Sequence, residues 1–254
     1  MKVFTTRGVR SLASYLSRVE EVSHELIPAS DAYLWFRGHG SEDWSLLPSL
    51  YRESYRKSLS EDDCRHEYRR LAWPYLSASG HEPRSDWDWY FMMQHYELPT
   101  RLLDWTESAL VALYFAVGAA GKERDAAVWA LDPWALNRRV AKRGDVVLTS
   151  EDATRYLNPP FSTRALPRRP IAIESPYKTR RIAAQRGAFT VHGSSARSLE
   201  TYPELRCHIA KIPIRQSSIR TIRAQLRTAG MTETTVFPEL PALARELIDY
   251  WQTA

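Results

Sequence analysis

Polar and ionisable side chains are concentrated in one stretch of the sequence, QHYELPTRLLDWT, at residues 94–106. It places an amide, an imidazole, a guanidinium and a carboxylate close together, at Gln94, His95, Arg101 and Asp104. Apolar sequence surrounds it, with WYFMM before and SALVALYFAV after. Polar groups in buried sequence must find hydrogen-bond partners or face a ligand. The stretch therefore predicts either a ligand pocket or a satisfied network that holds a loop in place.

The segments on either side must position these groups. DWYFMMQHY predicts a helix that ends before Pro99, because the residue before a proline disfavours helical backbone. Arg101 and Asp104 are three residues apart, a spacing that a helical turn brings together. Thr106 is the expected N-cap of a buried helix over SALVALYFAVGAAG. A lone histidine such as His95 is more often a hydrogen-bonded core residue than a catalytic base, and both readings stay open.

A second candidate group lies in AYLWFRG, residues 32–38, which predicts a buried strand that ends at Gly38. The guanidinium of Arg37 would then lie near the rim of a sheet. It could clamp a phosphate or carboxylate, or form a structural ion pair with Asp104. Further along, Gln185 precedes Gly187 and the strand AFTVHG, with KTRRIAAQRG as a connection or strand entry.

The remaining pattern predicts one α+β domain over residues 1–254, with a helical first half around a mixed or antiparallel sheet. Apolar periodicity indicates helices over residues 9–26 and 61–76 and over the two C-terminal segments IRTIRAQLRTAG and PELPALARELIDYW. Short apolar runs predict strands at AAVWALDP, IAIESPY and LRCHIAKIPI. The Arg- and Pro-rich residues 134–170 are expected to be irregular, with a short helix.

Charge and cysteine content limit the partners, the cellular location and the metal sites that we expect. Residues 1–133 hold 15 basic and 20 acidic side chains, which leaves 20 and 10 of the 35 and 30 for residues 134–254. A basic half rich in arginine can attract nucleic acid or another phosphate-bearing partner, although solvated arginines give the same pattern. Cys64 and Cys207 stand far apart without metal-ligand spacing, so we expect a reducing, cytoplasmic location and no metal. No apolar run of membrane-spanning length occurs, and the P-loop, GxGxxG, GxSxG and HExxH motifs are absent.

Three segments in order resemble the FRG domain family: WFRG with LLPSLYR, QHYELPTRLLDWTESALVALYFAV, and RRIAAQRGAFTVHG with TTVFPELPALARELI. The family takes its name from a Phe-Arg-Gly that stands here at residues 36–38. The resemblance covers about residues 30–247, after an N-terminal helix over residues 1–29. One departure is Glu97, where the family usually has glycine, which leaves open whether that turn needs a positive φ.

A more distant resemblance links YLWFRGHGS and ALYFA to the ADP-ribosyltransferases. It implies NAD as substrate, gripped by Arg37 and Gly38, with Tyr114 stacked on nicotinamide. The third position of that family, usually a glutamate on a later strand, falls to Gln185 or Glu174. The resemblance places Tyr114 on a strand, whereas the apolar pattern predicts a helix over residues 106–118. Such a reaction needs a positioned NAD and a stabilised ribosyl cation, and no metal.

The leading hypothesis is an ADP-ribosyltransferase-like enzyme in a bacterial toxin or phage-defence setting, with a nucleic acid or other phosphate-bearing acceptor and an antitoxin or defence partner. One rival is a non-catalytic nucleic-acid or nucleotide-binding module, and another is an interaction domain in which the polar motif is structural. The expected catalytic residues are Arg37, His95, Tyr114 and Gln185. The expected NAD-binding residues are Arg37, Gly38, Gln94, Thr100, Arg101 and Asp104.

Overall fold

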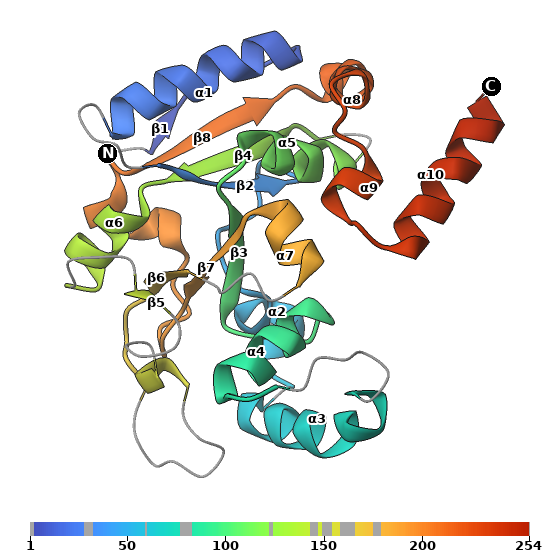
Figure 1. The fold of residues 1–254 in the computed structure, drawn as a ribbon. Coiled ribbons are helices and arrows are strands. Elements are labelled where there is room, and N and C mark those ends of the chain that lie inside the picture. The colour runs from blue at the N-terminus through green and yellow to red at the C-terminus, as the bar shows by residue number, and fades with distance from the viewer. Residues whose placement is uncertain are drawn as a thin grey trace.

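The fold is built around an eight-stranded mixed sheet, seen in the computed structural model of the chain (Figure 1). The structure describes residues 3–27, 33–58, 60–76, 83–121, 124–142, 147–148, 154–157, 166–174 and 179–253. The strands lie in the order β1-β8-β4-β2-β3-β7-β6-β5. Their bounds are β1 Phe4–Thr5, β2 Trp35–His39, β3 Leu102–Thr106, β4 Ala126–Leu131, β5 Val147–Leu148, β6 Ile171–Glu174, β7 Gly187–Val191 and β8 Ile209–Ile214. The pairs β1–β8 and β5–β6 are parallel, and the other neighbouring pairs are antiparallel.

Helices lie between the strands in sequence and after the last strand, and several begin at a capping side chain. Their bounds are α1 Leu12–Leu26, α2 Glu53–Arg56, α3 Glu61–Leu76, α4 Asp86–His95, α5 Ala109–Gly118, α6 Pro133–Ala135, α7 Arg180–Gln185, α8 Ile219–Thr228, α9 Glu233–Val236 and α10 Leu240–Thr253. Side-chain caps define several of the starts, because they satisfy N–H groups that have no partner within the helix. Ser11 forms a capping box with Ser14 at α1, and Ser85 accepts from the Asp88 N–H at α4.

The sheet consists of two wings that meet at a narrow seam. One wing holds β1, β8, β4 and β2, and α1, α5 and α8 pack on one of its faces. The other holds β3, β7, β6 and β5, and α4 packs against it. The seam is the β2–β3 contact, whose single paired position joins Phe36 to Thr106. Figure 1 shows the two strands running in different directions away from this point. The sheet therefore opens between β2 and β3.

Close packing of α5 on β2 explains the glycine of the Phe-Arg-Gly segment. A Cβ on Gly38 would lie 2.1 Å from the Ala112 carbonyl oxygen and 2.5 Å from the Ala116 nitrogen. Gly40, on the same face of the chain, would bring a Cβ to 2.1 Å from the Ala119 carbonyl oxygen. Backbone atoms cannot rotate away as a side chain can, so only glycine allows the helix to approach this strand so closely.

The α+β class and most of the predicted elements are confirmed. Helices are found within residues 9–26 and over residues 61–76, and strands run through the WFRG, AAVWAL, IAIE, AFTV and IAKIPI segments. Three predictions were wrong. The segment after Pro99 is the strand β3, RRIAAQ is the helix α7, and α5 is capped by Ser108, whose Oγ accepts from the Val111 N–H. Much of the predicted irregular stretch, at residues 143–146, 149–153 and 158–165, lies outside the described residues.

Candidate functional site

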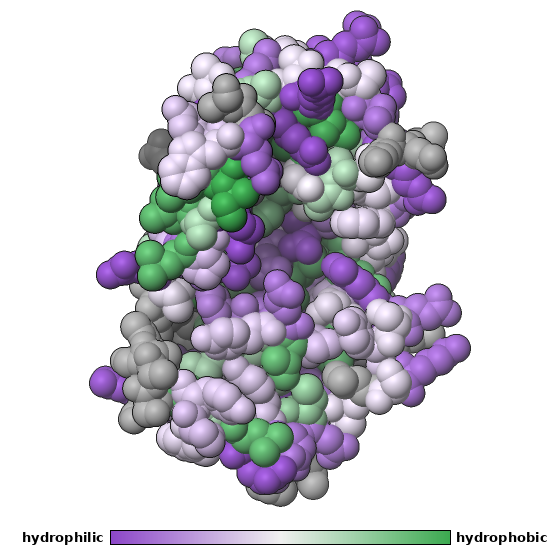
Figure 2. Space-filling model, turned by 90° about the vertical axis from the view of Figure 1, so that its right-hand side faces the viewer, coloured by the Kyte–Doolittle hydropathy of each residue, from purple (hydrophilic) through white to green (hydrophobic). Residues whose placement is uncertain are grey.

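A cavity of about 390 Å³ opens at the β2–β3 seam. Its walls come from β2, β3, the end of α4 with the turn that follows, α5 and α7. This volume lies within the range of about 300–1,000 Å³ for small-molecule sites. Figure 2 shows a hollow with hydrophilic residues at its bottom, at the height of α7 in Figure 1. Six residues predicted to bind or react line it: Arg37, Gly38, Gln94, His95, Asp104 and Gln185.

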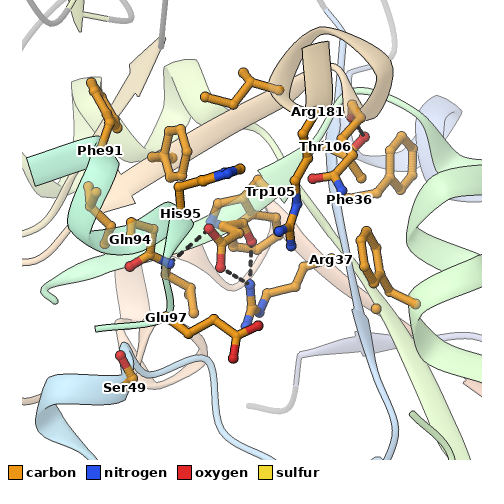
Figure 3. Close-up of a pocket in the computed structure, with 18 of the residues that line it drawn as sticks. Phe36, Arg37, Ser49, Phe91, Gln94, His95, Glu97, Trp105, Thr106 and Arg181 are labelled. Atoms are coloured by element: carbon orange, nitrogen blue, oxygen red, sulfur yellow. Dashed lines mark hydrogen bonds and ion pairs between the residues drawn. The ribbon is translucent and has the colours of Figure 1, made fainter. Parts of the chain in front are cut away.

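Arg37 lies across the seam and ties the two wings together. Its Nη1 donates to the Asp104 carbonyl oxygen at 2.5 Å and lies 3.5 Å from the Asp104 carboxylate Oδ2, while its Nε donates to His39 Nε2 at 3.1 Å. Its side chain is only 16% exposed. Burial lowers the pKa of the guanidinium, the carboxylate of Asp104 opposes that shift, and nearby Arg52 adds to it. The ion pair between Arg37 and Asp104 is thus confirmed, and it forms a wall of the cavity (Figure 3).

His39 accepts a hydrogen bond from Arg37 and holds its guanidinium in place, a role that was not predicted from the sequence. Burial lowers its pKa to about 3, with the charge of Arg37 as the next cause, so the imidazole is neutral. Nε2 accepts from Arg37, so Nδ1 carries the hydrogen and donates to the Trp44 carbonyl oxygen at 3.2 Å. A signal was present, because Arg37 and His39 are two residues apart and side chains at that spacing lie on one face of a strand.

A chain of hydrogen bonds orients the carboxylate of Asp104. Gln94 Nε2 donates to Asp104 Oδ1 at 2.9 Å, and the buried hydroxyl of Thr100 donates to Gln94 Oε1 at 2.5 Å. With its carbonyl occupied by Thr100, the Gln94 amide must present its N–H₂ to the carboxylate. Asp104 nevertheless remains 54% exposed, so it faces the cavity and not the core. Thr100 acts behind the wall, through Gln94, and does not line the cavity.

Two more arginines and a histidine complete the polar wall. Arg52 and Arg181 line the cavity although the sequence analysis did not single them out. Their signal was position, since they lie in the LPSLYR and RRIAAQRG segments. His95 is partly buried, and among the described residues no side chain or backbone group hydrogen-bonds its ring. Burial and the charge of Arg181 lower its pKa, which keeps it neutral at pH 7 and able to accept a proton.

The turn after α4 places Glu97 in a left-handed conformation, with φ of 64°. The Leu98 N–H bonds to the Met93 carbonyl at 3.0 Å and the Glu97 N–H to the Gln94 carbonyl at 3.1 Å. These two bonds define a Schellman motif, whose left-handed position glycine usually occupies. A residue with a Cβ costs about 1–2 kcal/mol there. The positive φ that the sequence left open is therefore present, and a glutamate adopts it.

Arg101 does not line the cavity, contrary to expectation, and does not pair with Asp104. It precedes β3 and its side chain is 1% exposed. Nε lies 2.8 Å from Glu61 Oε2 on α3, and Nη1 donates to the His192 carbonyl at 2.8 Å. Tyr90 donates to the same Glu61 and accepts from the Arg101 N–H. Arg101 is thus the centre of a buried network that joins α3, α4 and the end of β7.

Tyr114 and Gln185 also depart from the pattern that the ADP-ribosyltransferase resemblance implied. Tyr114 lies on the helix α5, as the apolar pattern predicted, and does not line the cavity. Gln185 lines it, but from the last residue of α7, and its Nε2 donates to the Val236 carbonyl at 3.2 Å. Glu174, the alternative to Gln185, lies on β6 and accepts from the Tyr33 hydroxyl at 3.0 Å, outside the cavity lining.

Residues 32–125 match the family model described as FRG domain, so the chain carries an FRG domain. The match spans β2, α4, β3 and α5, and with them Arg37, Gln94, His95 and Asp104. Searches of curated proteins and of solved structures found no match. Within the described residues, no group of three or more His, Cys, Asp or Glu side chains is arranged to hold a metal ion. No helix of that part of the chain is long and apolar enough to cross a bilayer.

Proposed function

We propose that the cavity binds NAD and that the chain is an ADP-ribosyltransferase-like enzyme. The observation that carries the proposal is the convergence of Arg37, Arg52 and Arg181 on one cavity. Planar guanidinium groups suit the pyrophosphate of a dinucleotide. Aromatic residues are also among those that line the cavity, and Phe115, which is partly exposed, suits contact with a flat ring.

Two polar groups of the wall, Asp104 and His95, have properties that fit the chemistry. The C1′–N bond of the nicotinamide ribose breaks, and nicotinamide leaves with the bonding electrons. The exposed carboxylate of Asp104, held by Gln94 and Arg37, would stabilise the ribosyl cation that develops. The acceptor nucleophile then bonds to C1′, and its proton passes to neutral His95. Asp104 takes this role in place of Gln185, whose amide is bound to Val236.

Nicotinamide release and calorimetry test the proposal directly. Purified protein is incubated with NAD and candidate protein and nucleic-acid acceptors, and free nicotinamide is measured by chromatography. Replacing Arg37 by Met removes charge-assisted hydrogen bonds and should weaken NAD binding about tenfold or more. Arg18→Met, at a partly exposed position on α1 outside the cavity, is the matched control and should leave binding unchanged. Absence of both nicotinamide release and NAD binding contradicts the proposal.

A second candidate is a nucleic-acid-binding module, favoured by the exposed arginines of the C-terminal half. Arg220 and Arg227 on α8 are exposed, and no ion pair forms with either among the described residues. Such a surface would bind phosphate without sequence preference, and the logarithm of its affinity would fall steeply with the logarithm of salt concentration. Charge reversal at these two positions would weaken nucleic-acid binding, whereas Arg37→Met would leave it intact. The same surface would serve the enzyme if the acceptor is a nucleic acid.

A further inference from the structure

Glu97 combines an unfavourable backbone with a position on the cavity wall. Among the described residues, three residues other than glycine have a positive φ: Glu97, Lys142 and Arg186. Only Glu97 among them also lines the cavity. Its Schellman hydrogen bonds use backbone atoms alone, so a glycine would make the same turn with less strain. Backbone strain that a glycine would relieve indicates that the side chain at this position has a functional role.

The carboxylate of Glu97 is free for that use. Figure 3 shows its side chain extending to the same side of the cavity as the guanidinium of Arg37. Within the described residues it makes no hydrogen bond and lies within 4 Å of no basic group, whereas the carboxylate of Asp104 is held by Gln94 and Arg37. The cavity therefore offers a second carboxylate, unengaged, beside the arginines proposed to bind phosphate.

A free carboxylate next to a phosphate site has a definite preference among ligand groups. It accepts hydrogen bonds from hydroxyls, and two vicinal hydroxyls of a ribose match its two oxygens. It repels a further phosphate at the same place, because the repulsion between two negative charges at short range raises the free energy of the complex. It thus favours a nucleotide with an unmodified ribose over one with a phosphorylated ribose.

We propose that Glu97 binds the hydroxyls of an unmodified ribose of the dinucleotide, so that the cavity selects NAD over NADP. This inference rests on the proposed NAD-binding function. It assigns the phosphates to the arginines and the ribose hydroxyls to Glu97. The turn that makes Glu97 strained is the same turn that carries its carboxylate to the mouth of the cavity.

Calorimetry with NAD and NADP on three proteins tests the assignment. The wild type should bind NAD at least about tenfold more tightly than NADP, the scale of one charge-assisted hydrogen bond. Glu97→Gln keeps the side-chain size and the left-handed backbone but removes the charge, and should bring the ratio close to one. Glu97→Gly should do the same and should also raise Tm by about 2–4 °C, because it removes the strain.

Each outcome has a definite meaning. Loss of discrimination in both variants, with a raised Tm for Glu97→Gly alone, supports the inference. NAD binding with an NAD-to-NADP ratio that neither variant changes overturns it and leaves the proposed function standing. Failure of the wild type to bind either nucleotide overturns the proposed function and this inference together.

Discussion

Two buried neutral histidines, His39 and His192, should make the stability of the protein sensitive to mild acid. His39 is 2% exposed and His192 is fully buried, and burial lowers the pKa of each from 6.5 to about 3. Positive neighbours add to the effect, Arg37 at His39 and Arg101 at His192. Neither ring nitrogen of His192 has a hydrogen-bond partner in the described structure. Protonation of either ring would place an uncompensated charge beside an arginine.

The direction and size of the effect follow from proton binding. Because the folded pKa is depressed, the stability contribution is present above pH 6.5 and is lost as pH falls from 6.5 toward 3. In that window the unfolded chain binds a proton at each histidine and the folded chain does not. The free energy of unfolding then falls by about 1.4 kcal/mol per pH unit for each histidine. From pH 8 to pH 5 this amounts to about 2 kcal/mol per histidine, or about 4 kcal/mol for the pair.

Urea unfolding at pH 8 and pH 5 measures this loss. Unperturbed carboxylates titrate mostly below pH 5, so the histidines dominate the difference. His192→Leu has similar volume and cannot be protonated, so it should lose only about 2 kcal/mol over the same interval. The exposed His24→Gln on α1 is the control and should behave as the wild type. A wild-type loss below about 1 kcal/mol, or an unchanged loss in His192→Leu, would refute the reasoning.

Two further substitutions test the packing and the buried network. Gly38→Ala should destabilise by about 3 kcal/mol or more, because its Cβ meets the backbone of α5, whereas Gly118→Ala, with nothing within 4 Å, should be neutral or stabilise slightly in thermal unfolding. Glu61→Ala leaves the buried Arg101 without its counterion and should cost about 3–5 kcal/mol in urea unfolding. Its control is Glu67→Ala on the exposed face of α3, which should leave the urea midpoint unchanged, and equal effects of the two changes would contradict the network.

The helices could be predicted from sequence because their signals are local. The helix α3 covers residues 61–76 as expected, since its first turn is acidic and its apolar residues recur at helical spacing. The end of α4 follows from Pro99 in the same way. The strand β3 has no such signal, because Leu102, Leu103 and Trp105 are all buried and the apolar pattern does not alternate. Its pairing with β7 joins residues more than eighty positions apart, which no local pattern encodes.

The residues of the site could be predicted where they lie close together in the sequence. Gln94, His95 and Asp104 line one cavity as predicted, and Arg37 pairs with Asp104 across the seam. Arg52 and Arg181, which were not predicted, join the cavity through tertiary contact. Arg181 reaches the cavity from α7, which was expected to be a connection or strand entry. Their distance from the motif along the chain hid their place in the wall.

The prediction that Arg101 lines the cavity was wrong because the residues after Pro99 were expected to form a helical turn. Side chains three residues apart lie on one face of a helix but on opposite faces of a strand. Reading the residues after Pro99 as a helical turn therefore placed Arg101 and Asp104 together. In the structure these residues form β3 and the position before it. The Arg101 side chain therefore lies in the core and pairs with Glu61, whereas the Asp104 side chain faces the cavity. The alternation of the strand thus divides the polar residues of this stretch between the buried network and the lining of the cavity. Arg101 lies behind the cavity wall, in the buried network with Glu61, and the Asp104 carboxylate lies on the wall itself.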